Sequence, residues 1–452
     1  MIMSNIPKGY RGDMANGMDP NAVQHLDAVT QKHIERRKDL LGPAYRLFYS
    51  DPVEIARGQG AYLYDSQGNE YLDAYNNVVS VGHSHPRVVQ AITQQVQTLC
   101  THTRYLQKPL LNYAEQLLNT HHGRIGSEGR TMFTCTGSEA NDLAMRIARY
   151  HTGKTGVIVT AEAYHGNSAV TAGFSPSLGR KSMLDPFVRV VPAPDSYRVP
   201  REGMGEWMAA NVKRQIEDME RHGGGLAAFI ADSLFSSDGL YSEPTDLLAP
   251  VAEVVRAAGG LFIADEVQSG FGRSGTHMWG YQRHGVDPDI VTMGKPMGNG
   301  YPVAGVIVRE DVVSAFGRDM RYFNTFGGNS VAIAAAQATL DVIQEEKLME
   351  NSHKMGQFLL EGLRDIGTRY EAIGDVRGAG LYFGVELVKD RGGKQPDMDL
   401  ALAAVNRLRQ HRVLISATGA DANILKIRPP LIFQEKDATR LLETVETVFA
   451  SF

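Results

Sequence analysis

Short apolar runs alternate with amphipathic stretches through the middle of the chain. Compact aliphatic runs predict buried strands, and apolar residues spaced three or four apart predict helices. The predicted strands are residues 131–135, 156–160, 188–191, 226–231, 261–264, 290–293 and 304–308, and the predicted helices are residues 88–99, 110–119, 143–150, 207–221 and 247–258. Because helices separate the strands, the pattern predicts an α/β fold with a mostly parallel central sheet.

The two ends of the chain follow a different pattern. A helix is predicted at residues 31–41, and an antiparallel ribbon is predicted from strands at residues 61–64 and 70–73. After Gly328 the predicted elements are helices at 332–346, 354–369 and 438–449 and strands at 380–387 and 413–416. We therefore expect an N-terminal arm (1–30), a large domain (79–330) and a smaller α+β domain built from residues 31–78 and 331–452.

Composition narrows the class of protein. The chain has 452 residues, enough for two domains, and a formal net charge of -5 with no long basic stripe, so no nucleic-acid partner is predicted. Two cysteines, Cys100 and Cys135, provide no disulfide framework. No apolar stretch is long enough for a membrane span and no signal peptide is evident, so we expect a cytoplasmic protein without a membrane partner. His83 and His85 lack a third ligand nearby, and no metal is predicted.

In a parallel sheet, ligands bind beyond the carboxyl ends of the strands, so the residues after each apolar run are the candidates for chemistry. Lys295 follows the run at 290–293, separated from it by Gly294, and precedes Pro296. A lysine at the end of a buried strand has two interpretations. It is a surface residue on a glycine-rich turn, or it forms a Schiff base with a carbonyl cofactor.

Other strand ends carry residues that complement such a lysine. Gly137 and Ser138 stand at the head of a helix, where free backbone N–H groups bind an anion, although Ser138 could also simply cap the helix. Tyr164 could stack on a flat ring or be a half-buried tyrosine. Asp265 ends a buried strand, where it could pair with a protonated ring nitrogen or form a structural ion pair.

A hydroxyl beside glycines, at Thr325, adds a second possible phosphate contact. A phosphate grip, a stacking ring, a buried acid and an activated lysine thus occur in order along successive strand ends. These are the parts needed to hold pyridoxal 5′-phosphate, which we predict as the cofactor.

As a set, five segments resemble the motifs of the class-III aminotransferase family of fold-type-I pyridoxal phosphate enzymes. They are residues 136–141, 163–166, 265–275, 292–300 and 325–329, and the resemblance extends from about residue 34 to near the C-terminus. It implies that Lys295 forms the Schiff base with pyridoxal phosphate. It also implies that Asp265 pairs with the pyridinium nitrogen and that Gln268 lies near the ring hydroxyl.

The same resemblance implies the remaining cofactor contacts. Gly137 and Ser138 would hold the phosphate, and Tyr164 would stack on the ring. Thr325 would reach the phosphate of the neighbouring subunit's cofactor, which implies a homodimer. Whether dimers pair further into a dimer of dimers is left open.

Two positions depart from the usual transaminase pattern of this family. Ser237 stands where transaminases carry a glutamate that offsets a substrate-binding arginine. Lys426 stands where they carry that arginine, three residues before the Pro-Pro pair. Lysine is a point charge without the bidentate fork of arginine, so the exchange weakens carboxylate recognition.

These departures, and segments 76–78, 103–106, 193–198 and 423–426, resemble a subgroup that includes ethanolamine-phosphate phospho-lyase. The resemblance implies a lyase that eliminates a β-leaving group, phosphate or hydroxide, from a small amino phosphate or amino phosphonate and releases ammonia and an aldehyde. The candidate substrate-binding residues are Asn77, Arg104, Lys426 and Arg428. An ω-amine or alanine–glyoxylate-type aminotransferase is the alternative, and the charged candidates could instead form ordinary salt bridges.

Overall fold

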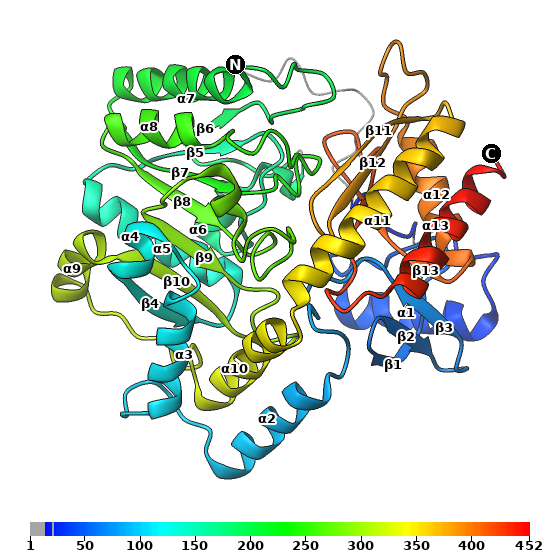
Figure 1. Ribbon diagram of the computed structural model, residues 1–452, viewed down its shortest axis with the longest axis horizontal. Helices are drawn as coiled ribbons and strands as arrows, with labels where there is room; N and C mark the ends of the chain where they lie inside the picture. The colour runs from blue at the N-terminus through cyan, green and yellow to red at the C-terminus, as the bar shows by residue number, and fades with distance from the viewer. Residues whose placement is uncertain (1–13, 20–21, 180) are drawn as a thin grey trace.

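The computed structural model describes residues 14–19, 22–179 and 181–452, so residues 1–13 and 20–21 of the predicted arm lie outside the described residues. Figure 1 shows a large sheet flanked by helices beside a smaller part, where the blue N-terminal strands lie next to the orange and red C-terminal helices. Elements from both ends of the chain lie together in this arrangement. The division into an arm, a large domain and a smaller domain, with boundaries at residues 30, 78 and 330, stays a prediction.

The large sheet has seven strands. In spatial order they are β4 (Gly129–Thr134), β10 (Ala304–Arg309), β9 (Ile290–Met293), β8 (Leu261–Asp265), β7 (Leu226–Asp232), β5 (Gly156–Thr160) and β6 (Val188–Val191). Strands β9, β8, β7, β5 and β6 are parallel, and only β10 runs antiparallel to its neighbours β4 and β9. The predicted α/β fold with a mostly parallel sheet is confirmed.

Helices cover both faces of this sheet. The helical elements of the larger part are α2 (Pro86–Thr98), α3 (Lys108–Leu118), α4 (Gly123–Ser127), α5 (Gly137–Thr152), α6 (Ala169–Ala172), η1 (Pro176–Leu178), α7 (Met204–Arg221), α8 (Ala249–Ala257), η2 (Gly280–His284), α9 (Glu310–Asp319) and α10 (Ser330–Glu345). Phe262 belongs to the core that includes α7 and α8, and its neighbour Ile263 belongs to the core that includes α5 and α9. Burial on both faces explains why these strands are continuous apolar runs.

The smaller part contains two four-stranded sheets around one core. Their strands, in order, are β1 (Ile55–Gln59), β2 (Tyr62–Asp65), β3 (Glu70–Asp73) and β13 (Val413–Leu414), then β11 (Ile373–Gly378), β12 (Phe383–Leu387), β15 (Ile424–Ile427) and β14 (Ser416–Thr418). Its helices are α1 (Ala28–Leu41), α11 (Leu348–Arg369), α12 (Met398–Gln410) and α13 (Glu435–Phe449). β13 pairs in parallel with β3, which joins the C-terminal region to the N-terminal ribbon.

Three details differ from the sequence-based expectation. The predicted strand at 380–387 begins only at Phe383, because Gly380 has φ +53° and turns the chain. A Cβ at Gly380 would lie 2.3 Å from the carbonyl oxygen of Arg273, so only glycine fits this turn. Strands β11 and β15 carry charged residues and were not predicted. Helix α10 packs on α2 and α3, and thus on the larger part, although its sequence was assigned to the smaller domain.

No helix in the described ranges is long and apolar enough to cross a membrane.

Candidate active site

A cleft with an empty volume of about 450 Å³ opens where the parallel strands end. Its lining residues are Gly137, Ser138, Asn141, Tyr164, His165, Gly166, Asp232, Asp265, Val267, Gln268 and Lys295. The cleft therefore brings together six of the seven residues predicted to bind the cofactor. The seventh, Thr325, is exposed and does not line it.

The head of helix α5 forms one wall of the cleft. Thr136 caps this helix, because its side chain accepts a hydrogen bond from the amide of Glu139 at 3.1 Å. The capping role considered for Ser138 thus belongs to Thr136, and the Ser138 hydroxyl instead exchanges hydrogen bonds with Asn167 at 3.1 Å. The amides of Glu139 and Ala140 are used within the helix, which leaves those of Gly137 and Ser138 for an anion.

Glycines allow the loops around this wall to approach one another closely. A Cβ at Gly137 would lie 2.9 Å from the methyl groups of Val267. A Cβ at Gly166, whose φ is +143°, would lie 2.5 Å from the Ser138 hydroxyl. The residues expected to grip a phosphate are consequently held against the loop that carries Tyr164, which is half-buried beside them.

The register of the sheet aligns three polar side chains. Asp232 at the end of β7 is opposite Asp265 at the end of β8, and Asp265 is opposite Thr292 on β9. Side chains opposite one another on neighbouring strands lie on the same face. This register places two carboxylates next to each other at the floor of the cleft.

Asp265 is buried and receives three N–H donors. Asn141 Nδ2 and His165 Nδ1 lie 2.8 and 2.7 Å from its Oδ2, and the amide of Val267 lies 3.0 Å from its Oδ1. Thr292 donates to Asn141 Oδ1 at 2.6 Å, which fixes the amide so that its nitrogen faces the acid. A carboxylate can only accept, so His165 carries its proton on Nδ1. Only one of these donors uses Oδ1, which can accept another.

Asp232, Asn141 and His165 were not singled out from the sequence. Asp232 ends an apolar run in the same way as Asp265, and that signal could have found it. Burial and the charge of Asp265 raise the pKa of Asp232, although the amides of Leu234 and Ser236 donate to its carboxylate. Asn141 and His165 give no comparable sequence signal. Their role depends on contact with Asp265, which lies 124 positions from Asn141 and 100 positions from His165.

Lys295 follows β9 and faces the two acids. Burial and the positive charge of Arg428 lower its pKa from 10.5 to about 8, while Asp265 and Asp232 act in the opposite direction. Among the described residues, no carboxylate lies within ion-pairing distance of its ammonium. A lysine with a lowered pKa and no fixed partner is suited to nucleophilic attack on a carbonyl carbon.

The predicted substrate residues occupy two separate places. Arg428 donates through Nη1 to Gln268 Oε1 and through Nε to the carbonyl oxygen of Tyr75 at 2.8 Å, so it adjoins the cleft. Lys426 is buried and its Nζ donates to the carbonyl oxygen of Ser236 at 2.8 Å. Arg104, in contrast, is exposed, with its guanidinium 3.7 Å from the ring centroid of Phe323.

Asn77 is 1% exposed, and neither atom of its amide group has a hydrogen-bond partner within the described chain. Buried polar atoms are nearly always paired, so this amide is a candidate for ligand contact.

Comparisons with known proteins agree on the family. The model of the family described as Aminotransferase class-III matches residues 48–449. The chain is 41% identical over 447 residues to ethanolamine-phosphate phospho-lyase homolog 1 of Caenorhabditis elegans, covering 94% of each chain. It is 40% identical to the alanine–glyoxylate aminotransferase 2-like protein of Drosophila melanogaster, covering 94% of this chain and 89% of the relative.

Among solved structures, a phospholyase from Arthrobacter in complex with phosphoethanolamine superposes with a TM-score of 0.89 at 42% identity, covering 93% of this chain and all of that one.

The cleft fits the pyridoxal 5′-phosphate of this family. The free amides of α5 suit a phosphate, the remaining acceptor capacity of Asp265 suits a protonated ring nitrogen, and Lys295 can reach a carbonyl carbon as a neutral amine. The sequence similarity, the superposition and the geometry lead to one conclusion: the chain belongs to the class-III aminotransferase family and is a pyridoxal phosphate-dependent enzyme.

Proposed function

We propose that this enzyme is a lyase that eliminates phosphate or hydroxide from a small amino phosphate or amino phosphonate, releasing ammonia and an aldehyde. The similarity to the two phospho-lyases supports this reaction. The observation that carries the proposal is a pair of buried cations beside the cleft, Lys426 and Arg428.

Lys426 and Arg428 are 7% and 6% exposed, and neither forms an ion pair with a carboxylate in the described part of the chain. Burial lowers the pKa of Lys426 well below its ordinary value, so an anionic ligand would favour its protonated form. Two cations without carboxylate partners suit a doubly charged phosphoryl group. A simple amine or a carboxylate would leave part of this charge uncompensated.

The unpartnered amide of Asn77 strengthens the assignment. Asn77 follows Tyr75, whose carbonyl oxygen accepts from Arg428 at 2.8 Å, so the two side chains belong to one region of the site. An amide provides both a donor and an acceptor for a phosphoryl oxygen or for the leaving group.

In the proposed reaction, pyridoxal phosphate supplies a conjugated ring that stabilises negative charge on the carbon next to the amine. Lys295, as a neutral amine, accepts the proton from that carbon. Asp265 keeps the ring nitrogen protonated, and Asn141 and His165 hold Asp265 in place. Lys426 and Arg428 orient the phosphoryl group. The carbon–oxygen bond to phosphate or hydroxide then breaks with its electron pair, and water hydrolyses the resulting enamine to an aldehyde and ammonia.

An aminotransferase is the second candidate, because the Drosophila relative is named for alanine–glyoxylate aminotransfer. A transaminase must bind a carboxylate in its keto-acid substrate. Lys426 lacks the bidentate fork of arginine, and its Nζ already donates to the Ser236 carbonyl oxygen.

One assay separates the two candidates. The purified holoenzyme is incubated with phosphoethanolamine or 1-hydroxy-2-aminoethylphosphonate without any keto acid, and released ammonia is measured over many turnovers. Sustained release is expected. Turnover that occurs only when pyruvate or another keto acid is added, with no ammonia, would contradict the lyase.

We also propose a homodimer. Leu99, Tyr105, Leu106 and Phe326 are 47%, 65%, 99% and 69% exposed. The two segments that carry them lie side by side, because the amide of Thr101 donates to the Ser330 hydroxyl at 3.2 Å and His102 contacts Phe323 edge to face. Exposed apolar side chains gathered in this way are typical of a protein interface.

Thr325 and Arg104 lie on this apolar face, and both are proposed to act on the partner's site. The face adjoins the cleft, since Asn324 Nδ2 donates to Glu139 Oε2 at 3.5 Å in the first turn of α5. In a two-fold dimer the same face meets its own copy, so its residues approach the partner's cleft.

Hybrid dimers that combine one Lys295→Ala subunit with one Arg104→Ala subunit test this arrangement. Recovered activity relative to either homodimeric variant supports action on the partner's site. A monomeric mass in light scattering would contradict the dimer.

A further inference from the structure

The loop that follows β7 carries a serine whose hydroxyl is buried without a partner. Ser236 is four residues after Asp232, which lines the cleft. No group in the described part of the molecule meets hydrogen-bonding geometry with its Oγ, although the hydroxyl lies near enough to Asp232 and Tyr382 to oppose the burial that raises the pKa of each. A buried hydroxyl in this state costs free energy unless a ligand completes it.

The backbone of Ser236 is fixed from both parts of the molecule. Its amide donates to Asp232 Oδ2 at 3.1 Å, within the larger part. From the smaller part, Lys426 Nζ and Thr418 Oγ1 donate to its carbonyl oxygen at 2.8 and 3.1 Å. The backbone of Ser236 is therefore held in one position, and its side chain is buried between the two parts of the molecule.

The groups around Ser236 are those expected at an anion site. Lys426 is bonded directly to its carbonyl oxygen, and Arg428 and Tyr382 both adjoin Gln268 of the cleft. A hydroxyl donor among buried cations matches the hydrogen-bonding needs of phosphoryl oxygens.

We propose that Ser236 is a substrate-specificity residue whose hydroxyl donates to an oxygen of the substrate's phosphate or phosphonate group, next to Lys426 and Arg428. This inference rests on the proposed function and extends it to a residue with no assigned role. It also gives a physical reason for Ser237. A glutamate at position 237, as in the transaminase pattern, would place a negative charge beside the phosphoryl group and repel it.

Replacement of Ser236 by alanine in the holoenzyme tests the proposal. KM for phosphoethanolamine should rise about tenfold to a hundredfold, the loss typical of one hydrogen bond to a charged group, while kcat changes much less. The melting temperature should change little, because the removed hydroxyl makes no hydrogen bond of normal geometry in the described chain. Ser236→Thr, which keeps the hydroxyl, should restore KM. Ser242→Ala, which removes another buried hydroxyl without a hydrogen-bond partner in the described chain, is the matched control and should leave KM unchanged.

Binding measurements separate phosphoryl recognition from a general distortion of the site. In calorimetry with the holoenzyme, Ser236→Ala should weaken inorganic phosphate at least about tenfold and leave ethanolamine, which lacks a phosphate, unchanged. Equal losses for both ligands, or unchanged phosphate affinity with unchanged KM, would overturn the inference.

Failure of the proposed function gives a different result. The native holoenzyme would then release no ammonia from phosphoethanolamine. The phosphate titration still decides the role of Ser236 in that case. Weaker phosphate binding to Ser236→Ala would support a phosphoryl site that serves another substrate, and unchanged phosphate binding would overturn it.

Discussion

The two ends of strand β9 carry charged residues in contrasting environments. Asp289, just before the strand, is 2% exposed, forms an ion pair with Arg309 and accepts a hydrogen bond from the amide of Phe262 at 2.8 Å. Lys295, just after the strand, has no carboxylate within ion-pairing distance among the described residues. One strand thus joins a fully compensated charge to an uncompensated one.

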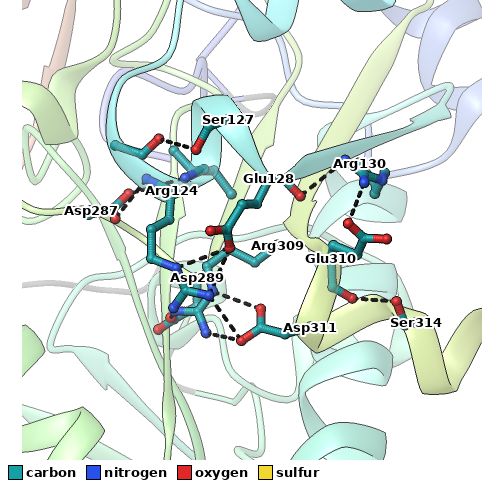
Figure 2. Close-up of polar contacts among 12 residues, drawn as sticks. Arg124, Ser127, Glu128, Arg130, Asp287, Asp289, Arg309, Glu310, Asp311 and Ser314 are labelled. Carbon is teal, nitrogen blue, oxygen red and sulfur yellow. Dashed lines mark hydrogen bonds and ion pairs between the residues drawn. The ribbon is translucent and has the colours of Figure 1, made fainter.

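The compensated end belongs to a wider network, which Figure 2 shows. Arg309 also pairs with Asp311 at 2.6 Å, and Arg124 pairs with Glu128 at 2.8 Å and with Asp311 at 3.3 Å. Such a network stabilises the position of strands without offering a free reactive group. In the cleft, the missing partners are what a cofactor and a substrate can supply, so the comparison separates structural charge from functional charge.

Removal of the uncompensated charge should have the largest effect. Lys295→Ala is expected to lower ammonia release at least about a thousandfold, because the variant loses both the amine that holds the cofactor and the proton acceptor. The visible absorbance of the protein-bound cofactor should disappear, while circular dichroism stays native. Substantial activity in this variant, measured without added amines, would contradict the assigned role.

Neutralisation of the buried acid should have the next largest effect. Asp265→Asn keeps the shape of the side chain but removes the charge that supports a protonated ring nitrogen, so kcat should fall about a hundredfold or more. The measurement is ammonia release at saturating cofactor, with cofactor retention followed by absorbance. An unchanged kcat would show that the ring nitrogen does not depend on this acid.

Disruption of the paired end should affect stability and leave the chemistry intact. Arg309→Ala removes the main partner of the buried Asp289 and should lower the free energy of unfolding by about 3 kcal/mol. Urea unfolding measures the loss, and kcat at room temperature should stay native. The matched control is Arg124→Ala, whose side chain is 48% exposed and whose loss should change the free energy of unfolding much less. A fall in kcat with an unchanged free energy of unfolding for Arg309→Ala would contradict the distinction between structural and functional charge.

The smallest effect concerns the protonation of Lys295. The amine reacts only when neutral, and its pKa is lowered to about 8. Cofactor uptake by the apoenzyme should therefore accelerate about tenfold per pH unit below the pKa and level off above about pH 8. Arg428→Gln should move the midpoint to higher pH, because Arg428 lowers the pKa of Lys295. A midpoint near the ordinary lysine value in the native apoenzyme would contradict the environment described for this amine.

The sequence by itself determined the central sheet and the edge of the sheet at which ligands would bind. Buried parallel strands must be continuous apolar runs, so Asp265 and Lys295 could be placed at that edge from local pattern, while their cofactor roles came from the set of motifs and stay predictions. Lys426 and Arg428 could be named only through resemblance, and their burial beside the cleft was not evident in the sequence.

Only the tertiary structure decided which other groups complete the site. Asp232 gains its place from the register of β7 and β8, and His165 from a contact with Asp265 across a hundred positions. The place of Ser236 is likewise set by a distant segment, because Lys426, 190 positions away, donates to its carbonyl oxygen. Local sequence patterns record whether a residue is buried, whereas the partners it meets or lacks depend on contacts between segments far apart in the chain.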